Sequence, residues 1–407
     1  MQSAKTLTAG VAPPSAARSR ALWAAGLGWG LDGFDFYLYV YALPGIIAAF
    51  SLTRAQGGLL ATQTLVASAI GGIGMGVLSD RIGRKRALML SIAWYALFTF
   101  FCGFAQNYAQ LAVLRTLEGL GFGGEWAVGA VLAAEWADPS RRGRSLGAIQ
   151  SAWAVGWLAA NAAFQLLAAT AGAQHGWRIL FLLGILPALA LLYIRRSVID
   201  PPLFTRAPRV APTRIFQRGL VRTTILATLL ATGVQSGYYA LFTWMPSFLA
   251  SDRRLPSLAS GAYLYALIAG SFVGYVTAGA VNDLLGHRAT FVLFSICSAL
   301  MVPLYLRFVT ANWELIPAGL LLGYFASGIF SGFGPFLSEL FPRGVRGAAQ
   351  GFCYNVGRGV AGIAPYAVGL LAARIAMGTA MIAIAVGAYA LAAIAALALP
   401  ETKGIEL

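Results

Sequence analysis

Long apolar stretches recur along the chain, and short segments between them hold most of the charged residues. Each stretch is about 20 residues or longer, the length that a helix needs to cross a hydrocarbon layer of about 30 Å. We therefore predict an all-α membrane protein with twelve transmembrane helices. Their approximate limits are 21–50, 56–79, 87–105, 110–137, 145–170, 177–196, 220–249, 257–281, 289–308, 313–341, 348–374 and 376–399.

Composition agrees with a membrane protein and argues against a water-soluble globule. Of the 407 residues, 59% are hydrophobic and only 11% are charged, whereas soluble domains carry about 25% charged residues. Cys102, Cys297 and Cys353 all lie in apolar segments, where cysteine behaves as a small hydrophobic residue. We expect no disulfide, metal site or cofactor.

The formal net charge of +15 would suggest nucleic acid as a partner in a soluble protein, but its placement favours a topological role. With a cytoplasmic N-terminus, 21 Lys and Arg residues fall in inside segments and 6 in outside segments. Such an excess is what the positive-inside rule requires of short loops. We predict a bacterial inner-membrane protein with both termini in the cytoplasm and no nucleic-acid partner.

A polar, Pro- and Arg-rich segment divides the twelve helices into two sets of six. The expected units are a tail (1–20), a six-helix bundle (21–196), a linker (197–219), a second six-helix bundle (220–400) and a tail (401–407). The halves look duplicated, because the segment 76–85 matches 279–288, and Glu135, Arg142, Gly143 and Gly147 match Glu339, Arg346, Gly347 and Gly351. Related bundles of this kind place a substrate site near the membrane midplane, between the halves.

The segment from Gly76 to Lys85 reads G-x-x-x-D-R-x-G-R-K, between the second and third helices. It resembles the signature loop of the major facilitator superfamily, and the resemblance implies a gating role for Asp80 and Arg84. The matching position in the second half is Asp283. A plain basic loop that only sets topology would explain the arginines, but neither the aspartate nor the spacing of the glycines.

Ionisable residues within a membrane helix are expensive and point to function. Asp32 and Asp35 lie near the centre of the first helix at i, i+3 spacing, on adjacent parts of one face. Two carboxylates so close repel each other, which suits one of them to bind and release a proton during a transport cycle. We therefore predict proton coupling at Asp32 and Asp35; the alternative is that they neutralise a buried arginine.

The fourth helix adds Arg115, Glu118 and Glu125. Glu118 and Glu125 share one face, so both are candidate proton-coupling residues, and Glu125 has no partner nearby in the sequence. Arg115 is a candidate substrate-binding residue. Alternatively, Arg115 and Glu118 form an ion pair within the helix that only lowers the cost of insertion.

The second half has one central charge, Arg358 in the eleventh helix. Its counter-ion is either a carboxylate of the first half or the transported substrate, and we favour the substrate because guanidinium binds carboxylate with two hydrogen bonds. Its neighbours Tyr354 and Asn355 are further binding candidates. In the seventh helix Gln235, Tyr238 and Tyr239 offer similar polar and aromatic groups, with packing as the alternative role.

Three strings narrow the substrate class: Asp-Gly-Phe-Asp-Phe at 32–36, Gly-Phe-Gly-Gly-Glu-Trp at 121–126 and Arg-Arg-Gly-Arg at 141–144. They resemble the sialate, aromatic-acid and metabolite branches of proton symporters for organic acids. The resemblance implies transport roles for Asp32, Asp35, Arg115 and Glu125. The closing Pro-Glu-Thr-Lys-Gly at 400–404 resembles the tail of sugar porters, which points the other way.

We therefore expect a monomeric secondary transporter in the lipid bilayer that takes up a small organic acid with protons by alternating access. A sugar or other neutral-solute porter, or a drug exporter, is the alternative of the same fold. A membrane sensor or membrane-embedded enzyme is a remote alternative, since the sequence shows no nucleotide loop, metal-ligand cluster or nucleophile with its base.

Overall fold

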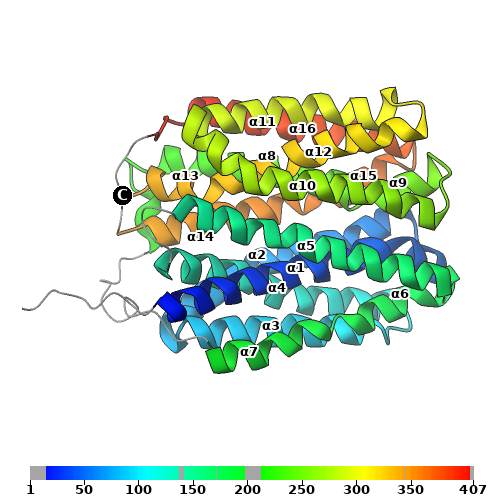
Figure 1. Cartoon of the computed structure of the whole chain (residues 1–407), viewed down its shortest axis with the longest axis horizontal. Helices are drawn as coiled ribbons and strands as arrows, with labels where there is room; N and C mark the ends of the chain where they lie inside the picture. Colours follow the sequence, from blue (N-terminus) through cyan, green and yellow to red (C-terminus); the bar gives the residue numbers. More distant parts are fainter. Residues whose placement is uncertain (1–14, 137–141, 171, 198–211, 343, 404–407) are drawn as a thin grey trace, which may run out of the picture.

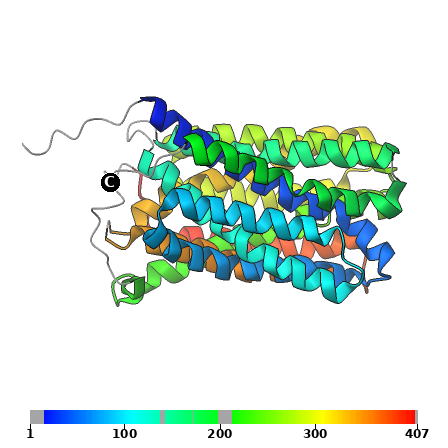
Figure 2. The ribbon, with the colours of Figure 1, turned by 90° about the horizontal axis from the view of Figure 1, so that it is seen from below.

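A computed structural model describes residues 15–136, 142–170, 172–197, 212–342 and 344–403. Over these ranges the chain forms helices and no strand. The long helices run roughly along one common direction and make two adjacent bundles (Figure 1; Figure 2 shows them from a second side). The described residues thus have the all-α fold in two six-helix halves that the sequence predicts.

The first bundle contains six spans. They are α1 (Ser15–Ala49), α2 (Arg54–Ile82), α3 (Arg84–Cys102), α4 (Tyr108–Trp136), α5 (Arg142–Thr170) and a broken sixth span made of α6 (Gly172–Leu183), η2 (Leu186–Leu189) and α7 (Ala190–Ser197).

The second bundle follows η4 (Pro212–Phe216) and again contains six spans. They are α8 (Val221–Phe242) with α9 (Met245–Ser251), α10 (Ser257–Leu285), α11 (His287–Pro303) with η5 (Leu304–Phe308), then η6 (Asn312–Glu314) leading into α12 (Leu315–Gly328), η7 (Ile329–Gly332) and α13 (Phe333–Leu340), then α14 (Arg346–Ala361) with α15 (Ile363–Leu371), and α16 (Met377–Ala398).

The two ends of the bundles hold different turns of the chain, and we call them the terminal end and the opposite end. The terminal end holds Ser15, Lys403 and the turns at Gly83 and Gly286; the opposite end holds the turns at Ser51 and Arg254. Gly83 and Gly286 occupy matching positions of the repeat, and both have positive φ, 95° and 90°. Glycine adopts this conformation without steric strain. The duplication seen in the sequence is therefore repeated in the backbone.

Small residues let helices pack closely in the same way in each half. In the first half Gly71 and Gly123 lie against backbone carbonyl groups across the α2–α4 contact, and in the second half Gly270 and Gly323 do so across the α10–α12 contact. A side chain at any of the four would collide with backbone. Such close packing through small residues is typical of membrane helices.

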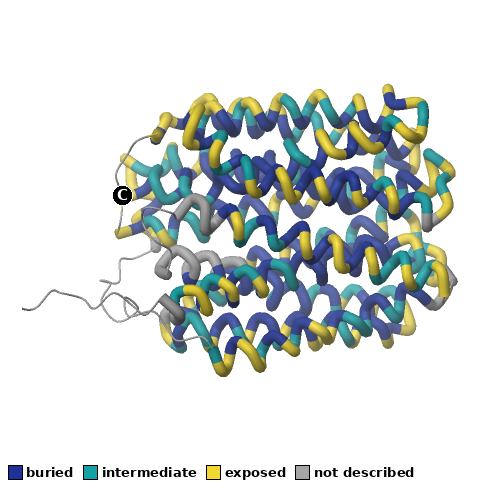
Figure 3. Tube along the Cα trace, viewed as in Figure 1, coloured by how far each residue is buried: buried dark blue, intermediate teal, exposed yellow. Residues whose placement is uncertain are grey.

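The halves meet along two seams, α2 against α14 and α15, and α5 against α10. The outer faces expose large apolar side chains such as Trp23, Leu166 and Ile394, whereas buried positions follow the inner faces (Figure 3). Nine described helices are long and apolar enough to cross a membrane. The three other spans, α1, α4 and α14–α15, carry the deeply buried ionisable side chains Asp32, Asp35, Arg115, Glu118, Glu125 and Arg358.

The helices differ from the expected ones at the start of the first span and within several later spans. Residues 15–20, which were expected in the N-terminal tail, are helical and belong to α1. Apolarity marks where a helix enters lipid, but it does not mark where the helix begins. The sixth, seventh and eleventh spans are also interrupted. Pro187, Pro246 and Pro365 each follow an interruption, since proline cannot donate the backbone hydrogen bond of a continuous helix.

Candidate functional site

The acidic side chains of α1 and α4 form two pairs. These helices run in opposite directions, so Asp32, nearer the terminal end, meets Glu125, and Asp35 meets Glu118. From the sequence we expected Asp32 and Asp35 to repel each other, and Asp35 does act on Asp32, but less than Glu125 does. Each aspartate instead finds its main carboxyl partner on α4, because the turn between them directs the two side chains to different levels of that helix.

The pair of Asp32 and Glu125 is buried without a hydrogen-bond donor. The two residues are 0% and 1% exposed, and among the described residues none donates a hydrogen bond to any of their four carboxyl oxygens. Tyr95 of α3 lies beside both, yet its hydroxyl is outside hydrogen-bond geometry. Two adjacent carboxyl groups without a donor are costly to bury if both are ionised.

The second pair is part of a larger cluster that already contains its own charge. Arg115 Nη1 lies 3.0 Å from Glu118 Oε2, an ionic contact without hydrogen-bond geometry. Thr99 of α3 donates a hydrogen bond of 2.6 Å to Asp35 Oδ1. The guanidinium also lies over the ring of Tyr39, 4.4 Å from its centroid. This cluster is partly balanced and hydrogen bonded, in contrast to the pair of Asp32 and Glu125.

Arg358 extends from α14 of the second half toward the first. It is 2% exposed, and its Cζ lies 5.6 Å from the ring centroid of Phe122 on α4 and 5.2 Å from that of Tyr354. The hydroxyl of Tyr239 on α8 also approaches the guanidinium. Asp32 and Glu125 are within its electrostatic reach. The first-half carboxyls are therefore one available counter-ion for Arg358, as the sequence had left open.

The other predicted binding residues of the second half have different surroundings. Gln235 donates a hydrogen bond of 3.1 Å to the carbonyl oxygen of Tyr354, which ties α8 to α14. Asn355 donates to the Gly351 carbonyl oxygen, at 2.9 Å, and its own oxygen lies against Gly72 of α2. Asn355 thus occupies a helix contact between the halves.

Among the described residues, no three His, Cys, Asp or Glu side chains could hold a metal ion.

A group of aromatic residues on α1 and α5 was not among the candidates selected from the sequence. The Tyr37 ring stacks on Trp157 with centroids 4.3 Å apart and planes 1° from parallel, and Trp157 donates to the Tyr41 hydroxyl at 2.9 Å. Trp153 donates to the hydroxyl of Tyr238, also at 2.9 Å. The signal was available, because Tyr37 and Tyr41, and likewise Trp153 and Trp157, are spaced i, i+4 and so share a helix face.

Hydrogen bonds between the halves gather on the side of the opposite end. The Tyr37 and Tyr238 hydroxyls lie 2.8 Å apart, and Asn161 of α5 donates to the Gly261 carbonyl oxygen at 3.2 Å. Near the end itself, Arg54 donates to the carbonyl oxygen of Ala372, also at 3.2 Å. In the described part of the chain these bonds join the halves toward the opposite end.

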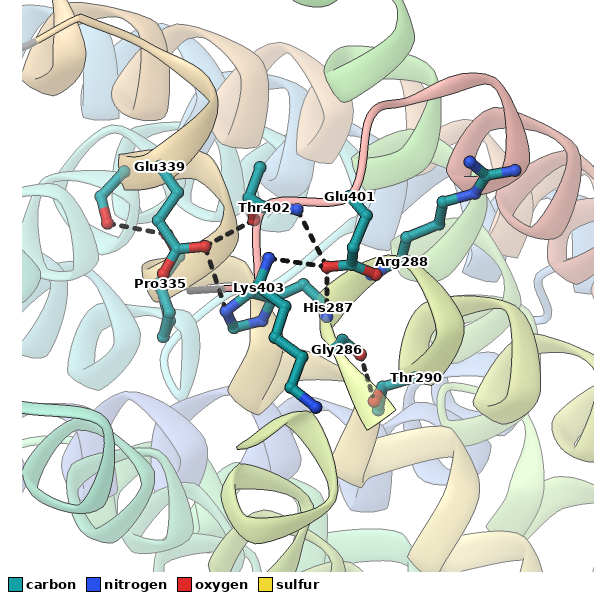
Figure 4. A network of polar contacts seen from close by, with 10 residues as sticks. Gly286, His287, Arg288, Thr290, Pro335, Glu339, Glu401, Thr402 and Lys403 are labelled. Atoms are coloured by element: carbon teal, nitrogen blue, oxygen red, sulfur yellow. Dashed lines mark hydrogen bonds and ion pairs between the residues drawn. The ribbon is translucent and has the colours of Figure 1, made fainter. Parts of the chain in front are cut away.

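The predicted gating residues lie at the terminal end. The side chain of Asp80 lies outside the described residues. Arg84 donates a short hydrogen bond to Ser79. Asp283, its counterpart in the second half, is exposed. At the matching turn a carboxylate comes instead from the C-terminal tail. Glu401 accepts hydrogen bonds from the backbone N–H groups of His287 and Arg288, at 3.0 and 3.1 Å (Figure 4).

Further contacts hold the tail in place. Glu401 also accepts from the N–H groups of Thr402 and Lys403, and Glu339 contacts both Thr402 and the His287 ring, the latter at 3.2 Å. Partial burial tends to raise the pKa of Glu401, but the four backbone donors outweigh it, so its pKa lies below the ordinary value. A carboxylate also stabilises the N-terminal end of α11. No structural role was expected for this tail from the sequence.

Comparison with known proteins agrees with this architecture. The family model described as "Major Facilitator Superfamily" matches residues 25–277. The chain is 41% identical to a probable 4-methylmuconolactone transporter of Cupriavidus pinatubonensis, over 96% of this chain and 92% of that protein. It is 32% identical to the cis,cis-muconate transport protein of Acinetobacter baylyi, over 92% of each chain, and 27% identical to a niacin transporter of the same organism, over 83% of each.

Proposed function

The chain belongs to the Major Facilitator Superfamily and is a multi-pass membrane transporter, not an enzyme. From this premise we propose that it takes up a small organic acid together with protons, by alternating access of a site between its two halves. The observation that carries the proposal is the buried pair of Asp32 and Glu125, which lacks a hydrogen-bond donor and lies within reach of Arg358.

The proton site follows from the missing donor. If both Asp32 and Glu125 were ionised, two adjacent negative charges would be buried with no hydrogen bond to either. A single proton on one of them supplies an O–H group that donates a hydrogen bond to the other, which removes one of the two negative charges and gives the pair the hydrogen bond that it lacks. A buried group that gains so much from one proton is suited to bind it on one side of the membrane and release it on the other.

Arg358 connects this proton to the substrate. While the pair is fully ionised, its charge attracts the guanidinium across the contact between the halves. Protonation weakens that attraction, and the carboxylate of an incoming acid then becomes the stronger partner for the fork of N–H groups. Proton binding would thus favour substrate binding, and by linkage the substrate would favour the proton. This reciprocity is what symport requires.

The second acidic pair has a different task in this scheme. Arg115 lies beside Glu118, and Thr99 donates to Asp35, so this cluster can stay charged without binding further protons. We assign it to holding α1, α3 and α4 together around the proton site. We therefore assign proton coupling to Asp32 and Glu125 and substrate binding to Arg358. Asp35, Glu118 and Arg115 then take neither role.

The surroundings of Arg358 support a small acid with a flat, unsaturated skeleton. Phe122, Tyr239 and Tyr354 present rings or hydroxyls to the guanidinium, and Trp153 lies behind Phe122 at a centroid distance of 6.4 Å. Aromatic side chains that stack on a flat π system gain free energy beyond that of the buried area alone. The relatives' names, which include muconate and niacin, agree with this class.

Orientation follows from charge. The inside segments of the predicted topology, which hold most Lys and Arg residues, are those at the terminal end, so we assign this end to the cytoplasm of a bacterial inner membrane. The hydrogen bonds between the halves then lie toward the outside. The described conformation would accordingly be one that is closed to the outside.

Transport by purified protein in proteoliposomes tests the proposal. An inward proton gradient should drive accumulation of an aromatic or unsaturated carboxylate, and the uncharged amide of the same compound should neither accumulate nor compete. Collapse of the gradient with a protonophore should leave only exchange of internal for external acid. Accumulation of the amide, or of a sugar, to the same extent would instead favour a neutral-solute porter.

A further inference from the structure

Gly28 lies one helical turn before Asp32 on α1 and faces α4. The space where its side chain would be is occupied by the carboxyl group of Glu125. A Cβ atom built on Gly28 would overlap Glu125 Oε1 and come within 3.2 Å of its Cδ. The nearest atoms to that Cβ all belong to Glu125. The absence of a side chain at Gly28 therefore decides where this carboxyl can lie.

Other glycines of the same helix have different neighbours. Gly30 and Gly33 face the α5 backbone, with the carbonyl oxygens of Ala152 and Trp153 at 3.1 and 2.6 Å from a built Cβ. They allow close helix packing. Gly26 has only Ile149 Cγ1 nearby, at 3.9 Å, an ordinary contact. Gly28 is thus the one of these four glycines that borders an ionisable group.

We propose that Gly28 is a positioning residue of the transporter, which keeps open the space that seats the Glu125 carboxyl against Asp32. This inference rests on the proposed proton site. A methyl group at position 28 would push against the far end of a flexible side chain and not against backbone. The helix can therefore remain in place while Glu125 moves away from Asp32, and the two carboxyls lose the geometry for sharing a proton.

A displacement of the Glu125 carboxyl would change its contacts with the groups that face it. Asp32 faces it from α1, Tyr95 from α3 and Arg358 from α14. The charged residues of α2 are Arg54, Asp80 and Arg81, which all belong to its first or last turn. On α4 itself the nearest charged residue is Glu118, two turns away. Displacement of Glu125 therefore alters mainly its relation to Asp32 and Arg358.

Gly129 offers a second, weaker version of the same perturbation. It lies one turn after Glu125 on α4, and a Cβ there would come within 3.2 Å of Glu125 Oε1. This approach is tight but not overlapping. Three alanine variants thus form a graded series, in which Gly28→Ala displaces Glu125 most, Gly129→Ala displaces it less and Gly26→Ala leaves it in place.

The experiment measures proton-driven accumulation of an aromatic acid against pH, and counterflow exchange at fixed pH, in proteoliposomes. Gly28→Ala should lower accumulation by about tenfold or more, as expected for a lost hydrogen bond to a charged group, and should shift the pH profile. Gly129→Ala should show a smaller effect, and Gly26→Ala should match the wild type. Counterflow should persist in all three.

Shortening the displaced side chain provides the rescue. Glu125→Asp removes one methylene group and makes room for the added methyl, so Gly28→Ala/Glu125→Asp should accumulate more acid than Gly28→Ala alone. A general packing defect would not be relieved in this way. If counterflow is lost in Gly28→Ala, its return in the double variant supports the proposal, and its absence overturns it.

Glu125→Gln separates this inference from the proposed function. If that variant still accumulates acid with the wild-type pH profile, then Glu125 carries no coupling proton, and both the proton site and the role of Gly28 are wrong. If Glu125→Gln is uncoupled but Gly28→Ala has the wild-type profile, the proton site stands and only the role of Gly28 is overturned.

Discussion

The hydroxyl oxygens of Tyr37 and Tyr238 lie 2.8 Å apart, and this hydrogen bond joins α1 of the first half to α8 of the second. Both side chains are buried, and Trp153 of α5 donates to the same Tyr238 oxygen. The contact lies between the central charged groups and the opposite end. We therefore interpret it as part of the barrier that closes the site toward that end.

Tyr37→Phe should weaken this barrier. Loss of one hydrogen bond costs about 1 kcal/mol, so the outward-open state should become more populated and the apparent affinity for external acid should rise. Tyr41→Phe is the matched control, because the hydrogen bond described for the Tyr41 hydroxyl comes from Trp157 of the same half. External KM measured in right-side-out vesicles should fall in Tyr37→Phe alone. Equal changes in both variants would assign the tyrosines to packing.

Asp32→Asn should abolish proton-driven accumulation while sparing counterflow, because an amide cannot take up and release the coupling proton. Asp35→Asn should behave differently, since it removes a carboxylate that accepts from Thr99 and lies beside Arg115 and Glu118. We expect lower thermal stability with coupling retained. Accumulation and a melting temperature measured for each variant separate the two outcomes, and unaltered accumulation in Asp32→Asn contradicts the proposed proton site.

Arg358→Ala should weaken binding of the acid by roughly thirtyfold or more, since truncating one partner of a desolvated charge pair costs about 2 to 5 kcal/mol. Lys should restore only part of the affinity, because it supplies the charge without the two-pronged geometry. Calorimetry with the acid and with its amide analogue checks this. An equal loss of affinity for both ligands would make Arg358 a structural residue.

Glu401→Gln should detach the C-terminal tail from α11 and lower the melting temperature by a few degrees near neutral pH. Because the pKa of Glu401 is lowered in the folded state, its contribution is present above the pKa of an unfolded glutamate, about 4.3, and is lost as the pH falls through the folded value. The difference between variant and wild type should thus vanish in acid. Asp283→Asn, at an exposed position, is the control and should show no such pH dependence.

Much of the architecture was predictable because each membrane helix is defined by its own residues. Apolar length marked all twelve spans, and the repeated glycine at 83 and 286 marked equivalent turns in both halves. Asp32, Glu125 and Arg358 could be selected from the sequence because an ionisable group deep in the membrane is costly. The depth of each group follows from the number of residues that separate it from the end of its helix. These features are local and can be read along the chain.

Pairing between helices is not local, and only the tertiary structure decided it. Asp32 and Asp35 are three residues apart, yet the antiparallel packing of α1 and α4 gives each a different glutamate as its partner. In the sequence, Gly28 resembles any small residue of a membrane helix. Only the structure shows that the Glu125 carboxyl occupies the space where a side chain at position 28 would lie. Likewise, Glu401 caps a helix that begins more than a hundred residues earlier in the chain. The distance between two such groups depends on how their segments pack in space. The spacing of residues along one helix does not contain that information.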